Sequence, residues 1–96
     1  MYEVIYTGQF KKSLKLCVRR GLDIKNFTTV LDILQEKGQL PAEYRPHRLH
    51  GNDEGCWECH ITPDWLLIWQ QDDKQLRLIL VDTEIEIGRA SCRERV

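Results

Sequence analysis

The chain has 96 residues, of which 42% are hydrophobic and 30% charged, and its formal net charge is −1. These values fit one soluble globular domain with a modest core. No apolar run reaches the roughly 18 residues that a membrane helix needs, and the first residues lack the basic and apolar regions of a signal peptide. We therefore expect a cytoplasmic location and free thiols rather than disulfides.

Charge is divided unevenly along the chain. Residues 1–50 carry nine Lys/Arg against five Asp/Glu, whereas residues 51–96 carry five against ten. The basic first half could supply a phosphate-facing surface that the net charge hides. Alternatively, its lysines and arginines are only the solvated face of a helix.

The first half predicts a strand and two helices. Residues 2–7 alternate and are rich in β-branched and aromatic side chains. Apolar residues recur at helical spacing from Thr7-Gly8 to Gly21, and again from Asp23, an expected N-cap, to Gly38, an expected C-terminal glycine. The two helices, joined by a tight turn, are expected to form an α-hairpin.

The second half predicts strands. Pro41 and Pro46 restrict the segment between them to extended or turn geometry. Strand-like runs follow at 47–49, 56–61, 65–69 and 76–81, with turn signals between them. The expected fold is α+β: an N-terminal strand, the α-hairpin, and an antiparallel meander of three or four strands packed on the helices.

Residues 86–96 fit nothing before them, because they have no periodicity and few apolar groups. They resemble the in-frame translation of a widely used sequencing adapter. We interpret them as an artefactual or disordered tail, in which Cys92 has no function, and predict one domain over residues 1–85. The alternative is a genuine basic tail.

Titratable side chains concentrate around one predicted hairpin. This cluster comprises His47, His50, His60, Cys56, Cys59 and Asp64. Residues 56–60 match the C-x-x-C-H haem-attachment pattern. Attachment of haem would need an export signal that the sequence lacks, and the only methionine, Met1, is the initiator. Coincidence is therefore the favoured explanation.

A zinc site is the second interpretation of the cluster. Cys56, Cys59 and His60, with His47 or His50, could supply four ligands. In a strand, however, Cys56 and Cys59 point to opposite faces, because their separation is odd. We therefore predict no metal and no cofactor.

Acid–base chemistry without a metal is the third interpretation, and the clustering of histidines favours it. Cleavage of RNA needs a base that takes the 2′-hydroxyl proton and an acid that protonates the leaving 5′-oxygen. Cationic groups must also steady the negative charge on the phosphate. Two or three imidazoles with one carboxylate are enough for this reaction.

Three blocks of sequence, at residues 6–12, 40–51 and 59–69, resemble the YafQ-like branch of the RelE-type toxins of type II toxin–antitoxin systems. The last block, His-Ile-x-Pro-Asp-Trp followed by apolar residues, is the most specific. The resemblance spans residues 2–83. It implies a RelE-like fold and a ribosome-dependent messenger-RNA endonuclease, held inactive by an antitoxin in a hetero-oligomeric complex.

The resemblance also implies roles for individual residues. His47, His60 and Asp64 match the family's catalytic residues. RNA contacts are expected from Lys11, Lys12, Arg48, His50 and Trp65. For Trp65 we weigh stacking on a base against packing in the core, and the core is favoured.

One departure from the family pattern affects activity. After the last strand the family usually has a basic residue followed by Thr-Gly-Ser/Thr-His, whereas this chain has Asp82-Thr83-Glu84-Ile85-Glu86. Loss of one acid–base group typically costs about 10²–10⁴-fold in rate. We therefore expect a weakened ribonuclease toxin. The alternative is an impaired scaffold that only binds the antitoxin or the ribosome.

Overall fold

A computed structural model describes residues 1–49 and 55–85, so His50 and the predicted tail lie outside the described residues. The elements, in chain order, are β1 (Glu3–Tyr6), α1 (Gly8–Arg19), α2 (Ile24–Lys37), the 3-10 helix η1 (Ala42–Tyr44), β2 (His47–Arg48), β3 (Cys56–Thr62), β4 (Trp65–Asp72) and β5 (Arg77–Ile85). The predicted α+β order is confirmed.

The helices begin and end where local chemistry predicts. The side chains of Thr7 and Asp23 each accept a hydrogen bond from a backbone N–H in the first turn, at 3.1 and 2.9 Å. Gly38 ends α2 with φ of 72°, a left-handed conformation that favours glycine. A Cβ at Gly38 would also lie only 2.6 Å from the Tyr2 hydroxyl, so glycine is required there for two reasons.

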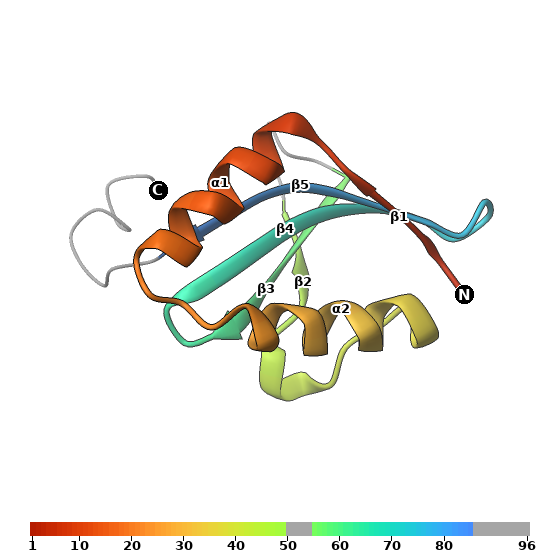
Figure 1. Ribbon diagram of the computed structural model, residues 1–96. Helices are drawn as coiled ribbons and strands as arrows, with labels where there is room; N and C mark the ends of the chain where they lie inside the picture. Colours follow the sequence, from red (N-terminus) through yellow and green to blue (C-terminus); the bar gives the residue numbers. More distant parts are fainter. Residues whose placement is uncertain (50–54, 86–96) are drawn as a thin grey trace.

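The strands form one sheet in the order β1-β5-β4-β3-β2 (Figure 1). Strands β2 to β5 are the expected antiparallel meander, and β1 pairs with β5 in parallel at the other edge. The sheet is therefore mixed and has five strands. Strand β5 runs to Ile85, four residues past its predicted end.

Both α-helices cover the same face of the sheet (Figure 1). The core between them is formed by the buried side chains of Phe10, Cys17, Phe27, Val30, Leu31, Leu34, Cys59, Ile61, Trp65, Leu67, Trp69, Leu78 and Leu80. The other face, which carries Glu58, His60 and Ile68, has no α-helix of the described residues over it; we call it the helix-free face. Among the described residues, no helix is long and apolar enough to span a membrane.

Candidate active site

Strand register places the candidate catalytic side chains on the helix-free face. Residues directly opposite one another in paired strands project from the same face. His47 of β2 lies opposite Glu58 of β3, Glu58 opposite Ile68, and Ile68 opposite Asp82 of β5. These four residues form one row across the face. His60, Leu66 and Glu84 form a second row beside it.

Both ring nitrogens of His47 lie within hydrogen-bond distance of an oxygen atom. Nδ1 lies 2.9 Å from the carbonyl oxygen of Arg45, and Nε2 lies 2.9 Å from Oε1 of Glu58. A carbonyl oxygen can only accept, so Nδ1 carries a proton. Nε2 faces a carboxylate, and a contact of this length needs one further proton between the two groups. The His47–Glu58 pair therefore holds a proton at the sheet surface.

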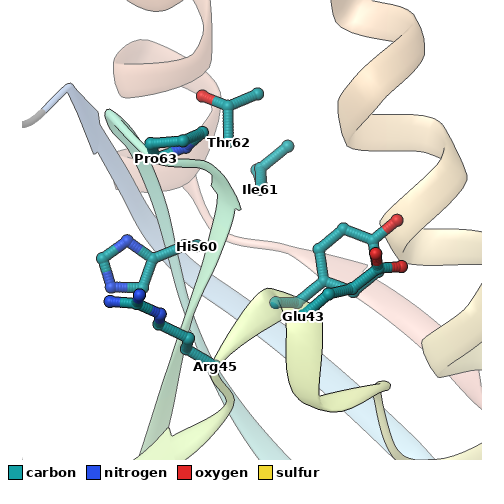
Figure 2. A pocket seen from close by; sticks show the side chains of 7 residues that line it. Glu43, Arg45, His60, Ile61, Thr62 and Pro63 are labelled. Atoms are coloured by element: carbon teal, nitrogen blue, oxygen red, sulfur yellow. The ribbon is translucent and has the colours of Figure 1, made fainter.

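His60 lies two residues after Glu58 on β3 and projects from the same face as His47. Such diagonal neighbours on adjacent strands are about 7–8 Å apart, which leaves room for a phosphate between the two rings. Among the described residues, the His60 ring makes no hydrogen bond. His60 and Arg45 line one pocket and lie at the same end of it in Figure 2.

Asp64 lies in the two-residue turn between β3 and β4, where its side chain is exposed. The preceding strand has an irregular register between His60 and Thr62, a β-bulge of the kind that redirects side chains next to functional sites. The structure thus places Asp64 four residues past His60, but outside the pocket that His60 lines. No contact between the two side chains follows from this geometry.

Three of the residues expected to contact RNA lie away from the two histidines. Lys11 and Lys12 are exposed on α1, which packs on the opposite face of the sheet. Arg48 lies opposite Trp57 on β3, and its guanidinium carbon is 5.2 Å from the centre of that ring. Because successive residues of a strand alternate in direction, Arg48 projects away from the face that carries His47.

Trp65, named among the expected RNA contacts although packing in the core was favoured, is buried in the core. Its side chain has 0% exposure, so no base can stack on the indole. The indole Nε1–H donates to Oγ1 of Thr83 at 2.7 Å, and the Thr83 hydroxyl donates to the carbonyl oxygen of Leu66 at 2.7 Å. Trp65 is a core residue whose indole N–H is hydrogen-bonded, in agreement with the core packing that the sequence analysis favours.

Cys56 and Cys59 point to opposite faces of β3, as strand geometry predicts. Cys59 is part of the core beneath the helices, whereas Cys56 lies outside that cluster, opposite Gln70. Burial raises the pKa of the Cys59 thiol to about 12, which opposes the thiolate that zinc requires. The described residues therefore do not bring together a set of four ligands.

The sequence interpretation missed Arg45 and Glu58 near the candidate site. It considered Asp82, but it did not place Asp82 in the same row as His47. Glu58 could have been found, since it precedes His60 by two residues in a predicted strand and must share its face. Arg45 could not, because its position depends on how η1 ends. Its φ of 49° is left-handed, and Pro46 disfavours the helical conformation there.

Comparison with known proteins identifies this architecture. The mRNA interferase toxin YafQ of Escherichia coli K12 is 36% identical over 76 residues, which are 78% of this chain and 83% of that protein. The E. coli DinJ–YafQ toxin–antitoxin complex contains a chain that aligns with a TM-score of 0.77 and 30% identity, over 88% of this chain and 91% of that one. A metal-bound toxin from Helicobacter pylori aligns with a TM-score of 0.79 and 32% identity, over 88% and 94%.

Residues 2–88 match the family described as a bacterial toxin of type II toxin–antitoxin systems, YafQ. The fold is thus that of a small bacterial toxin. The chain belongs to the YafQ toxin family.

Proposed function

We propose that this toxin is an endoribonuclease that cuts messenger RNA on the helix-free face, with His47, His60 and Asp64 as its catalytic residues. The observation that carries the proposal is that two histidines in different hydrogen-bonding states, His47 on β2 and His60 on β3, project from the same face of the sheet. One holds a proton with Glu58, and the other makes no hydrogen bond among the described residues. The name of the E. coli relative, mRNA interferase toxin, supports the same reaction.

The two histidines divide the proton transfers. His60 takes the proton from the ribose 2′-hydroxyl, and the 2′-oxygen attacks the adjacent phosphorus. The bond from phosphorus to the 5′-oxygen breaks, and His47 gives the proton at Nε2 to that leaving oxygen. The products are a 2′,3′-cyclic phosphate and a 5′-hydroxyl end. Glu58 then faces a neutral ring, which is ready to be protonated again.

Charge near the reacting phosphate comes from Arg45, which lines the same pocket as His60 (Figure 2). A fixed cation at that position stabilises the additional negative charge of the transition state. Asp64 is proposed to orient or relay protons for His60 once RNA is bound. We propose that no metal takes part, since both nitrogens of His47 are already held by Arg45 and Glu58.

The partners follow from the relatives and from the exposed site. The relative in the DinJ–YafQ complex is bound by an antitoxin. We propose that a cognate antitoxin likewise covers the helix-free face in a hetero-oligomeric complex. The substrate is proposed to be messenger RNA on the ribosome, and the location the cytoplasm.

A second candidate function, a scaffold that binds its partners without cutting, is favoured by one observation. Asp82 lies in the same row as His47 and places a carboxylate where RNA phosphates would approach. Its Oδ1 accepts a hydrogen bond of 2.8 Å from the backbone N–H of Thr83. A fixed negative charge at this position repels phosphate.

Induction of the toxin in a bacterial host distinguishes the two functions. Three proteins are compared: the chain as it stands, a version with a Thr-Gly-Thr-His ending, and that version with His60→Ala. We expect growth arrest and cleavage of translated messages from the version with the new ending, and neither from its His60→Ala variant. Addition of EDTA in vitro should leave cleavage unchanged.

The matched control is Asp32→Asn, which changes an exposed carboxylate on α2, far from the helix-free face. This variant should cleave as well as its parent. If neither ending gives cleavage and His60→Ala alters nothing, the chain is a binding scaffold and the enzymatic proposal is wrong.

A further inference from the structure

A pocket of about 330 Å³, lined by both polar and apolar side chains, lies between η1 and the end of β3, next to the proposed reaction centre (Figure 2). Strand β2 pairs only with Trp57 and Glu58, so β3 extends beyond its partner. No described strand pairs with residues 59–62 on that side. The space beside them is instead bounded by η1, and it opens where His60 projects.

The pocket has two chemically different ends. Arg45 and His60 lie at one end and Glu43 lies at the other, as Figure 2 shows, and Tyr44, the neighbour of Glu43 in the chain, also lines the pocket. The first end can bind a phosphate, because a guanidinium matches phosphate geometry with two parallel N–H groups. The second end offers a carboxylate, which accepts hydrogen bonds, beside an aromatic ring that can stack on a base.

We propose that this pocket binds a single nucleotide of the RNA next to the bond that is cut, and that it selects a base with an exocyclic amino group. The phosphate of that nucleotide contacts Arg45 and His60, its base lies against Tyr44, and Glu43 accepts hydrogen bonds from the amino group. The inference rests on the proposed function, and it assigns to η1 the choice of cleavage site.

Size and backbone geometry both support this assignment. Pockets for small ligands usually have volumes of about 300–1,000 Å³, and this one, at about 330 Å³, lies at the lower end of that range. Arg45 is held in a left-handed conformation, which is unfavourable for a non-glycine residue and is typical of functional sites. The Arg45 carbonyl oxygen also accepts a hydrogen bond from Nδ1 of His47, while the Arg45 side chain lines the pocket together with His60.

Charge separation decides which base fits. Glu43 would repel a phosphate, so the nucleotide can enter in only one orientation. A carboxylate accepts from the amino groups of guanine, adenine or cytosine, whereas uracil presents a carbonyl oxygen at the equivalent position. We therefore expect discrimination against uracil of about tenfold, within the range that one well-placed hydrogen-bonding pair provides.

The test is an NMR titration of the isotope-labelled toxin with guanosine 3′-monophosphate, uridine 3′-monophosphate and inorganic phosphate. We expect shifts at residues 43–45 and 60–63, and about tenfold tighter binding of the guanosine nucleotide than of the uridine nucleotide. Glu43→Gln should abolish that preference while phosphate still binds. Arg45→Asn, which keeps a residue suited to the left-handed conformation, should weaken binding of all three compounds.

Glu36→Gln is the matched control, because Glu36 is an exposed carboxylate on α2 that does not line the pocket. This variant should bind the nucleotides as the parent does. Shifts confined to α1, or an equal effect of Glu43→Gln and Glu36→Gln on the preference, would overturn the inference. Because binding is measured without cleavage, the two proposals fail separately: a toxin that cleaves with neither ending but still binds guanosine nucleotide here would refute the proposed function and leave the pocket assignment standing.

Discussion

The hydroxyl of Tyr2 donates a hydrogen bond of 2.6 Å to Oδ1 of Asp73, which lies in the turn between β4 and β5. The same carboxylate oxygen accepts a hydrogen bond of 2.8 Å from the side-chain amide of Gln71, which also donates to the carbonyl oxygen of Gly38. The start of the chain is thereby tied to the end of α2 and to the β4–β5 turn.

This contact predicts a pH-dependent contribution to stability. The hydrogen bond from Tyr2 lowers the pKa of Asp73 below its ordinary 3.8, and the same bond raises the pKa of Tyr2 above 10.0. The contribution of Asp73 is present above its unfolded pKa and is lost as the pH falls through its lower folded value. The contribution of Tyr2 is present below pH 10 and is lost as the pH rises through its higher folded value.

Tyr2→Phe should therefore destabilise the protein most between about pH 5 and 9, and less at either extreme. Urea unfolding at a series of pH values measures the difference. Tyr6→Phe is the control, because Tyr6 is exposed and its hydroxyl makes no hydrogen bond among the described residues. A difference between Tyr2→Phe and the parent that stays constant from pH 2 to 7 would contradict the assignment.

A second prediction concerns Glu58, which we propose to be a positioning residue for His47. Glu58→Ala should slow RNA cleavage, because it removes the acceptor that holds the proton at Nε2, but by less than the about 10²–10⁴-fold expected when an acid is lost. Glu58→Asp should recover part of the rate. Ring nitrogen NMR shifts of His47 report the effect directly: they should change in Glu58→Ala, whereas those of His60 should not.

The buried contact between Trp65 and Thr83 predicts a large effect of a small substitution. Thr83→Val removes the acceptor of the indole N–H and leaves that group unsatisfied in the core, at a cost of about 1–3 kcal/mol. Thr83→Ser keeps the hydroxyl and should lose less stability. The urea midpoints of the two variants provide the measurement, and equal midpoints would show that the hydrogen bond does not stabilise the fold.

Thiol reactivity distinguishes core cysteines from ligands. Cys17, Cys56 and Cys59 are free and buried, and the pKa of Cys59 is raised to about 12. We expect iodoacetamide at pH 8 to modify none of the three in the folded protein and all of them in urea, as peptide mass spectrometry would show. Rapid modification of Cys59 in the folded protein would mean that β3 separates from the core often enough to expose the thiol, and it would contradict this prediction.

A gain of function is expected from Asp82→Arg. The substitution reverses a charge in the row that contains His47, and it supplies the basic residue usual in the family. Binding of a short RNA, measured by fluorescence anisotropy, should tighten, and its dependence on salt should steepen by about one unit of slope. Asp32→Arg makes the same charge change on α2, and an equal gain from it would show that net charge alone is responsible.

Much of this fold could be predicted from local chemistry. The caps at Thr7, Asp23 and Gly38 act within a few residues, so the sequence alone locates both helices. His47 and His60 were predicted as catalytic because the motif that contains them is specific, and their catalytic role stays a prediction.

Pairing between distant strands could not be predicted in the same way. The register that sets His47 opposite Glu58 depends on contacts between strands rather than on either segment. The parallel pairing of β1 with β5 joins residues more than 70 positions apart. The end of β5 was missed because Asp82, Thr83 and Glu84 are polar, and only the finished sheet shows that Thr83 is buried.

The parallel pairing of β1 with β5 also sets when a newly made chain can complete its sheet. Synthesis begins at the N-terminus, so β1 has no strand to join until residues 77–80 have left the ribosome. At about 5–20 residues per second, the wait is about 4–15 s. Throughout this interval the two helices have no complete sheet to cover, and the row that joins His47 to Asp82 does not exist. The proposed site on the helix-free face can therefore be completed only after residues 77–80 have been made.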